Sequence, residues 1–144
     1  MGSTLPITDG LKLGFGLMRL PRLGNNTQYD PIDVEQTKKM VDAFLAAGGK
    51  YFDTAFVYEG SEEATRDALC LRHPRESYYL ASKLNAASFA CKSEAEAKAQ
   101  LATSLERTQA GYFDFYLLHA IGPGNAQNYE DYGIWQFVSE AKDK

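Results

Sequence analysis

The sequence predicts an α/β fold in which β-strands and α-helices alternate along the chain, and three observations lead to this prediction. Four short apolar segments have the composition of strands and lie well apart in the sequence. Each is followed by a segment with apolar residues at helical spacing and with helix start signals. This alternation is typical of a parallel sheet built from right-handed crossovers. Four such units form either an open doubly wound sheet or half of a (β/α)8 barrel, and the pattern alone does not choose.

The four expected strands are rich in aromatic and aliphatic residues. They comprise residues 13–17, 50–55, 77–83 and 112–119. The turn-forming pair Asp9 and Gly10 before the first strand predicts a short N-terminal β-hairpin. The nearly unbroken apolar run YFDFYLLH of the fourth strand predicts burial on both of its faces.

Capping signals mark the first two helices. Asp30 is expected to be the N-cap of the first helix, with Pro31 in its first turn, and Gly48 and Gly49 are expected to stop it. Ser61 is expected to be the N-cap of a single second helix.

The third and fourth helices have their own signals. Ser93 and Glu96 form a capping box, and Gly111 is the C-cap signal of the third helix. The face of that helix expected to be buried carries Ala97, Leu101 and Leu105. A last helical pattern over residues 129–144 includes Ile134, Trp135, Phe137 and Val138.

Composition and charge exclude several classes of protein. At 144 residues, the chain is expected to form one domain over residues 1–144. A net charge of −4 and the lack of a basic run argue against a nucleic-acid partner. No apolar run approaches the roughly 20 residues of a membrane helix, and the N-terminal segment lacks the features of a signal peptide. We therefore expect a cytoplasmic protein that binds neither nucleic acid nor a membrane.

The two cysteines do not predict a special site. Cys70 and Cys91 lack the spacing of a metal-binding pair and have no neighbouring histidine pair. We expect free thiols that serve in packing, and no metal.

Four polar residues fall at, or just after, the carboxyl ends of the expected strands. Asp53 and Tyr58 follow the second strand, Lys83 ends the third, and His119 ends the fourth. In parallel α/β folds these strand ends share one face, where the active site lies. Taken singly, each residue is more often structural: a cap, a packing tyrosine, a solvated lysine or a core histidine. Four on the same face favour an active site.

These residue types suit the reduction of a carbonyl group. A free tyrosine is a poor acid at neutral pH, but a neighbouring ammonium favours its phenolate. Lys83 can supply that charge, Asp53 can hold Lys83 in place, and His119 can donate a hydrogen bond to a substrate oxygen. The set predicts that Tyr58 protonates the alkoxide that forms as a hydride arrives from a nicotinamide.

Four segments carry a resemblance to a known family. They are LGFGLMRLP at the first strand, YFDTAFVYEGSEEA at the second, ASKL at the third and DFYLLH at the fourth. With these segments the sequence resembles the aldo-keto reductases, which are (β/α)8 barrels that reduce aldehydes and ketones with NADPH. The resemblance implies that the chain is the first four βα units of such a barrel.

The resemblance also implies a role for each site residue. Tyr58 would be the general acid, Lys83 and Asp53 its tuning pair, and His119 the residue that orients the carbonyl. The residues aligned with the dinucleotide contacts are Gly16, Leu17, Met18 and Asp53. The implied cofactor is NADPH, with NADH as the alternative, and the implied partner is a small carbonyl substrate.

The length of the chain opens a second hypothesis. The resemblance implies four further strands that carry much of the cofactor site, so these 144 residues alone are expected to be inactive. Half of a barrel has unpaired strand edges and exposed apolar surface, which favour self-association. The alternative is therefore a non-catalytic interaction or regulatory protein built on a half barrel. An open reading frame that continues beyond Lys144 with further strands would favour the enzyme.

Overall fold

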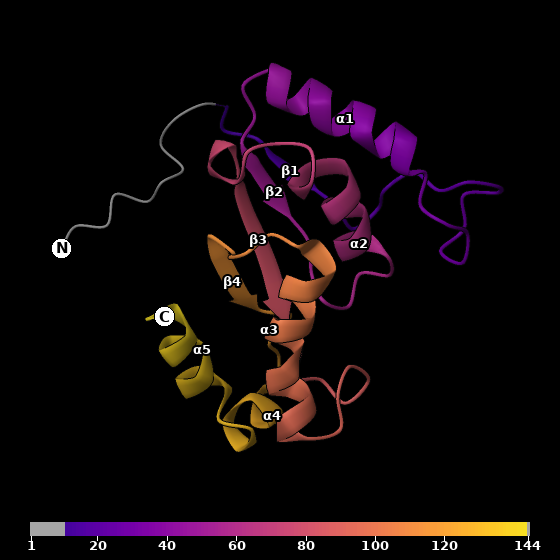
Figure 1. Ribbon diagram of the computed structural model, residues 1–144. Coiled ribbons are helices and arrows are strands. Elements are labelled where there is room, and N and C mark those ends of the chain that lie inside the picture. The colour runs from indigo at the N-terminus through magenta and orange to yellow at the C-terminus, as the bar shows by residue number, and fades with distance from the viewer. Residues whose placement is uncertain (1–10, 144) are drawn as a thin grey trace.

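The computed structural model describes residues 11–143, and its elements alternate as the sequence predicts (Figure 1). The expected hairpin at Asp9 and Gly10 lies outside the described residues. The strands are β1 (Gly14–Gly16), β2 (Tyr51–Asp53), β3 (Tyr79–Leu84) and β4 (Phe115–Leu118). The helices are α1 (Val34–Ala46), α2 (Ser61–Thr65), the π-helix η2 (Arg66–Cys70), the 3₁₀-helix η3 (Arg75–Ser77), α3 (Glu94–Thr108), α4 (Ala126–Asp131) and α5 (Ile134–Lys142).

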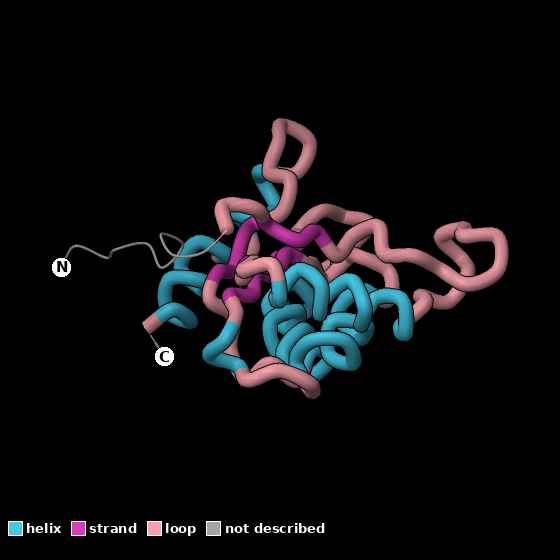
Figure 2. The backbone as a smooth tube through the Cα atoms, turned by 90° about the horizontal axis from the view of Figure 1, so that it is seen from above, coloured by secondary structure: helices cyan, strands magenta, loops and turns pink. Residues whose placement is uncertain are grey.

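The sheet is parallel, and its strands lie in sequence order, β1-β2-β3-β4. In a doubly wound sheet the order reverses at a switch point, and no reversal occurs here. Crossovers that always advance in one direction place their helices on the same side, and Figure 2 shows the helices gathered mainly on one side of the strands. The arrangement is that of part of a (β/α) barrel.

Side chains alternate between the two faces of this sheet. On the helix-covered face, the rings of Phe15, Phe44 and Phe52 pack with centroids 5.2–5.6 Å apart. Because successive residues of a strand point in opposite directions, Tyr51 and Phe115 lie on the other face, where their rings are 5.7 Å apart. The second face is therefore the one that would line the interior of a closed barrel.

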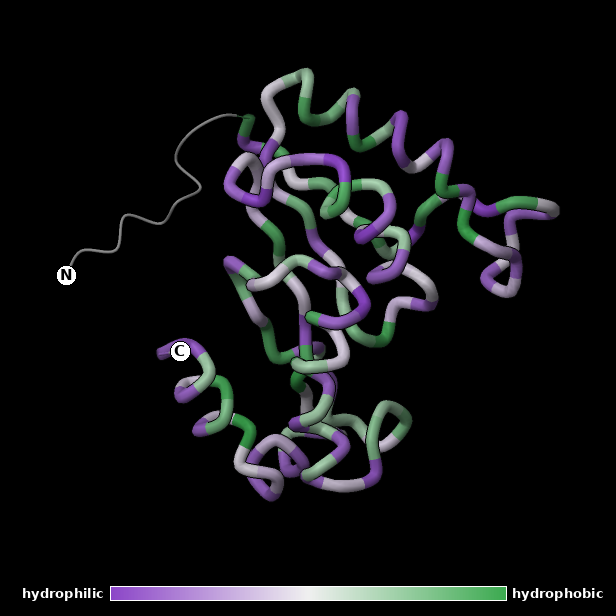
Figure 3. Tube along the Cα trace, viewed as in Figure 1, coloured by the Kyte–Doolittle hydropathy of each residue, from purple (hydrophilic) through white to green (hydrophobic). Residues whose placement is uncertain are grey.

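The first helix begins later than the sequence predicts. Asp33, and not Asp30, is the N-cap of α1, and its side chain accepts a hydrogen bond from the Gln36 amide at 3.0 Å. The Asp30 carboxylate instead accepts bonds from the amide and hydroxyl of Thr27, which close a turn before the helix. Figure 3 shows hydrophobic and hydrophilic residues alternating along α1, as expected for a helix that buries one face.

The second helix also differs at its start and in its continuity. Its N-cap is Gly60, in a left-handed conformation with φ of 71°, and Ser61 is the first helical residue. The Ser61 hydroxyl is engaged elsewhere, because it donates to the Leu17 carbonyl at 2.8 Å and lies 2.7 Å from Thr54 Oγ1. The expected single helix is divided into α2 and the π-helix η2.

In α3, the Ser93 cap is confirmed, whereas the expected buried face is partly wrong. The Ser93 hydroxyl accepts from the Glu96 amide at 3.2 Å, but the Glu96 carboxylate accepts from the Lys92 amide. The buried residues are Ala97, Gln100, Ser104 and Thr108, whereas Leu101 and Leu105 are only partly buried. Gln100 is buried because its amide exchanges two hydrogen bonds with the Asn85 backbone at the end of β3.

Three further expectations in the second half of the chain are wrong. The left-handed residue that ends α3 is Gln109, with φ of 54°, and not Gly111. The fourth strand is not buried on both faces: Leu117 is 39% exposed, because its side chain points to the uncovered face of the sheet. The last helical pattern is divided at Gly133, whose φ of 61° separates α4 from α5, and Trp135 is exposed while Ile134 is buried.

None of the helices within residues 11–143 combines the length and the apolar composition needed to cross a bilayer.

Candidate active site

The register of the sheet brings three of the expected site residues onto the same face. Asp53 pairs with Ala81 of β3, and Lys83 lies two residues further along that strand. Lys83 pairs with Leu117 of β4, and His119 again lies two residues further. A step of two keeps a side chain on the same face, so Asp53, Lys83 and His119 all project from the uncovered face at the carboxyl end of the sheet.

Lys83 lies at the centre of the site. Its Nζ donates to Asp53 Oδ2 at 2.6 Å, to the Thr54 carbonyl oxygen at 2.8 Å and to the Tyr58 hydroxyl oxygen at 3.2 Å. The residue is only 9% exposed. An ammonium removed from water in this way requires compensating partners, and Asp53 provides the opposite charge. The structure therefore brings Asp53, Tyr58 and Lys83 into direct contact.

His119 completes the group through the ring of Tyr58. The two rings meet edge to face, with centroids 5.4 Å apart and planes at 86°. Burial lowers the pKa of His119 below its usual value, the charge of Lys83 lowers it further, and Asp53 acts in the opposite direction. These effects favour the neutral imidazole, which has a single N–H to donate. Its Nδ1 atom is buried and has no hydrogen-bond partner among the described residues.

The His119 backbone is held by a residue that the sequence did not indicate. Tyr129 of α4 is fully buried, and its hydroxyl donates to the His119 carbonyl at 2.7 Å. The same hydroxyl accepts from the Ala86 amide at 3.2 Å. The His119 amide in turn donates to the Leu84 carbonyl at 2.9 Å. An isolated tyrosine in a polar segment gives no sequence signal for this contact.

The residues aligned with dinucleotide contacts lie at the end of β1 and just after it. Gly16 is exposed, and a Cβ placed there would meet no atom within 4 Å. Met18 is exposed as well. Leu17 differs, because its side chain is fully buried and its amide donates to the Asp53 carbonyl at 2.8 Å. Of these residues, Gly16 is the one with open space beside its backbone.

Two clefts lie near the site, and neither is lined by Asp53, Lys83 or His119. The larger, of about 770 Å³, lies between the loop after β1 and the start of α2, and none of Asp53, Tyr58, Lys83 and His119 lines it. The smaller, of about 330 Å³, is lined by Tyr58 and also by Phe89 and Arg107. Within residues 11–143, no three His, Cys, Asp or Glu side chains form a set that could hold a metal ion.

Comparison with known proteins decides the family. A model of the aldo/keto reductase family matches residues 12–144. The chain belongs to the aldo/keto reductase family. It is 30% identical over 135 residues to the aldo-keto reductase str7 of Strobilurus tenacellus, which covers 92% of the chain. It is also 32% identical over 109 residues to an aldo-keto reductase of Mycolicibacterium smegmatis, which covers 74% of the chain.

Solved aldo-keto reductases have the same arrangement of elements. A Pseudomonas aeruginosa structure, named as a candidate aldo-keto reductase, has a TM-score of 0.74 at 23% identity, over 93% of this chain and 52% of that one. The aldo-keto reductase of Klebsiella pneumoniae in complex with NADPH has a TM-score of 0.54 at 27% identity, over 82% of this chain and 39% of that one. The chain spans 40% and 37% of the lengths of the two curated relatives.

Proposed function

We propose that this aldo/keto reductase chain carries the proton-donating part of an active site that reduces aldehydes or ketones with NADPH. Tyr58 is the general acid, Lys83 and Asp53 form the pair that tunes it, and His119 orients the substrate carbonyl. The observation that carries this proposal is the contact of Lys83 Nζ with both Asp53 and the Tyr58 hydroxyl. An ammonium at this distance stabilises the phenolate that remains when Tyr58 has given up its proton.

Each of the four residues has its own part in the proposed reduction. The O–H bond of Tyr58 breaks, and its proton moves to the carbonyl oxygen, which becomes the hydroxyl of the alcohol. Lys83 donates no proton in this step, because its ammonium forms an ion pair with the Asp53 carboxylate. The neutral His119 donates its N–H to the carbonyl oxygen and holds it near Tyr58. Solvent then returns a proton to Tyr58.

A nicotinamide cofactor fits the open side of this site. The space beside Gly16 leaves room for a group to approach the end of β1 next to Asp53. When bound, NADPH supplies the hydride that reduces the carbonyl carbon. Gly16, Met18 and Asp53 would contact it, whereas the Leu17 amide is engaged with Asp53. The NADPH complex of the Klebsiella relative supports the choice of cofactor, and NADH remains the alternative.

The matched relatives are about twice as long as this chain or longer, so we propose that four more strands complete the barrel and the cofactor site. The 144 residues alone are then inactive. The test compares NADPH oxidation by the full-length protein, with 4-nitrobenzaldehyde as reporter substrate, with that by residues 1–144. Activity in the full-length protein alone supports the proposal. No NADPH- or NADH-dependent reduction of any aldehyde or ketone by the full-length protein would overturn it.

A second candidate function rests on the exposed edge of the sheet. Within the described residues β4 is an edge strand, and Leu117 on its uncovered face is 39% exposed; an unpaired edge and exposed apolar surface both favour association with another chain. In that case the 144-residue chain is an interaction or regulatory protein that associates with a copy of itself through β4. Sedimentation of residues 1–144 at several concentrations tests this directly.

A further inference from the structure

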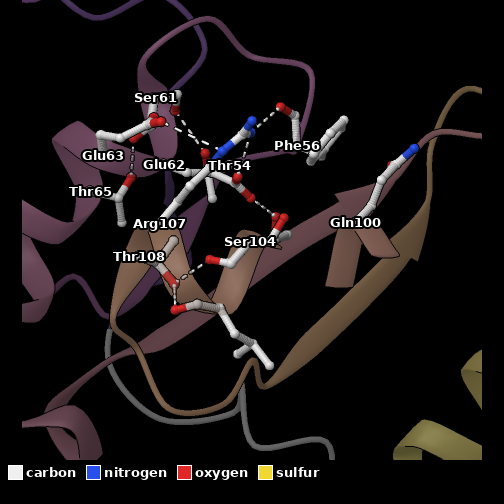
Figure 4. Close-up of polar contacts among 12 residues, drawn as sticks. Thr54, Phe56, Ser61, Glu62, Glu63, Thr65, Gln100, Ser104, Arg107 and Thr108 are labelled. Carbon is white, nitrogen blue, oxygen red and sulfur yellow. Dashed lines mark hydrogen bonds and ion pairs between the residues drawn. The ribbon is translucent and has the colours of Figure 1, made fainter. Parts of the chain in front are cut away.

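A carboxylate that takes no part in the proposed proton transfer is buried behind the sheet. The Glu62 side chain, on α2, is 1% exposed. One of its oxygens accepts from the Ser82 hydroxyl at 2.9 Å, and the other lies 3.3 Å from Nη1 of Arg107 (Figure 4). Ser82 precedes Lys83 on β3, so it points to the helix side while Lys83 points to the site. The buried charge is therefore fixed to the strand that carries Lys83.

Arg107 of α3 connects the buried Glu62 to the loop after β2. Its Nη1 atom also donates to the Phe56 carbonyl at 3.1 Å. Its guanidinium carbon lies 4.6 Å from the centre of the Phe56 ring, and its Nε is 3.6 Å from a Glu63 carboxylate oxygen. Figure 4 shows the guanidinium of Arg107 between Phe56 and Glu62. One side chain thus binds the backbone and the ring of Phe56.

The contact fixes the loop that carries Tyr58. The Phe56 amide donates to the Lys83 carbonyl at 3.2 Å, so the residue is bound to β3 through its N–H and to Arg107 through its C=O. Tyr58 follows two residues later, where its amide donates to Ala55 and its carbonyl accepts from the Ser61 amide. Phe56 therefore connects the loop that carries Tyr58 both to the strand of Lys83 and to Arg107.

We propose that Arg107, held by the buried Glu62, is a positioning residue that sets the separation between the Tyr58 hydroxyl and the Lys83 ammonium. The catalytic part of this inference rests on the proposed function, whereas the geometric part does not. If the Glu62–Arg107 pair were only structural, replacing both side chains by uncharged ones would change the stability little and would leave Tyr58 in place. A positioning role instead predicts a loss of Tyr58 geometry in a protein that is still folded.

The first experiment is NMR on residues 1–144 with ¹³C-labelled tyrosine, in which Tyr58→Phe assigns the Tyr58 signals. Arg107→Met is expected to shift the Tyr58 ring signals and to weaken its cross-peaks with His119 and Lys83. Arg107→Lys is expected to restore them in part, since an ammonium can reach the Phe56 carbonyl but lacks the planar fork. The control is Arg72→Met, an arginine of similar exposure (31% against 33%) that pairs with Asp42 on the surface.

Arg107→Met leaves Glu62 buried without its partner, and this can unfold the chain. The double variant Glu62→Gln with Arg107→Met removes both charges and keeps an acceptor for Ser82. It is expected to fold and still to show the displaced Tyr58 signals. Wild-type Tyr58 signals and cross-peaks in the folded single or double variant would overturn the proposal.

The second experiment measures reduction by the full-length protein. Arg107→Met is expected to lower kcat by about tenfold to 100-fold with a much smaller change in KM, the scale of a small misplacement of a reacting group. A wild-type kcat in this variant, while Tyr58→Phe is inactive, would refute the positioning role alone. If Tyr58→Phe retains full activity while Arg107→Met still displaces Tyr58, the proposed function fails and the geometric inference stands.

Discussion

Asp53 and Lys83 lie on neighbouring strands, and Asp53 Oδ2 is 2.6 Å from Lys83 Nζ. The other acceptors of Lys83 are the Thr54 carbonyl and the Tyr58 hydroxyl. Because an ammonium has three N–H donors, these three contacts account for all of them. Lys83 is thus directed at Tyr58 by two acceptors on and just after β2.

The first prediction concerns Lys83. In the full-length protein, Lys83→Met is expected to lower the rate of carbonyl reduction and to change its pH profile, since the charge that stabilises the Tyr58 phenolate is removed. Steady-state kinetics across pH measure both effects.

Lys92→Met and Lys98→Met are the matched controls. Lys98 pairs with Glu94 along the surface of α3, and Lys92 lies just before that helix, so neither change should affect the rate. Equal pH profiles for all three variants would show that Lys83 has no special role.

The second prediction is a pH dependence of stability. The pKa of His119 is lowered in the folded state from its usual value of 6.5. Well above pH 6.5, His119 is neutral in both the folded and the unfolded states, so its protonation does not reduce the free energy of unfolding. As the pH falls below 6.5, the unfolded chain takes up a proton that the folded chain resists, so the free energy of unfolding decreases.

Urea unfolding of residues 1–144 at pH 7 and pH 5 measures this effect, and His119→Asn should remove part of the decrease. NMR titration of the imidazole, assigned by its loss in His119→Asn, gives the pKa directly. A value at or above 6.5 would contradict the structural account of His119.

The third prediction concerns a tight contact at the end of α1. A Cβ added to Gly49 would lie 2.4 Å from Cζ of Phe44, whose ring is packed against Phe15 and Phe52. Gly49→Ala should therefore cost about 1–3 kcal/mol of stability, as overpacking of a core does. Gly122→Ala is the control, because a Cβ there meets nothing within 4 Å. Equal urea midpoints for the two variants would show that the Phe44 ring moves aside without a loss of stability.

The fourth prediction concerns association of residues 1–144. Leu117 is exposed on the edge strand β4 and lies on the same uncovered face as Phe115. The chain is expected to self-associate in sedimentation experiments, and Leu117→Asp should shift it toward monomer by placing a charge in that contact. A wild-type chain that remains monomeric at all concentrations would refute this expectation.

The strand ends, and the positions of the polar residues near them, could be predicted because they depend on local signals. Apolar runs located the strands, and their carboxyl ends located Asp53, Lys83 and His119. The caps were harder to predict, since Asp30 and Asp33 are equally good capping residues, and a turn closed by Thr27 decided between them. A competing tertiary contact also determined the role of Ser61, whose hydroxyl binds Leu17.

Long-range polar contacts gave no signal in the sequence. Gln100 is buried although it is polar, because only the fold brings it to the end of β3. Arg107 and Tyr129 likewise donate to the carbonyl oxygens of Phe56 and His119 from helices later in the chain. Helical spacing favoured Leu101 and Leu105 as buried residues, but the polar requirements of the strand end determined the buried face.

The most direct test of the central claim is the single-turnover rate of hydride transfer in full-length Tyr58→Phe, with NADPH binding measured by fluorescence titration on the same preparation. The substitution removes only the hydroxyl that lies 3.2 Å from Lys83 Nζ, and the ring can keep its contact with His119. The account predicts unchanged NADPH binding and a rate lower by about 10²-fold or more, the usual scale for the loss of a positioned acid. Reduction at the wild-type rate would contradict it.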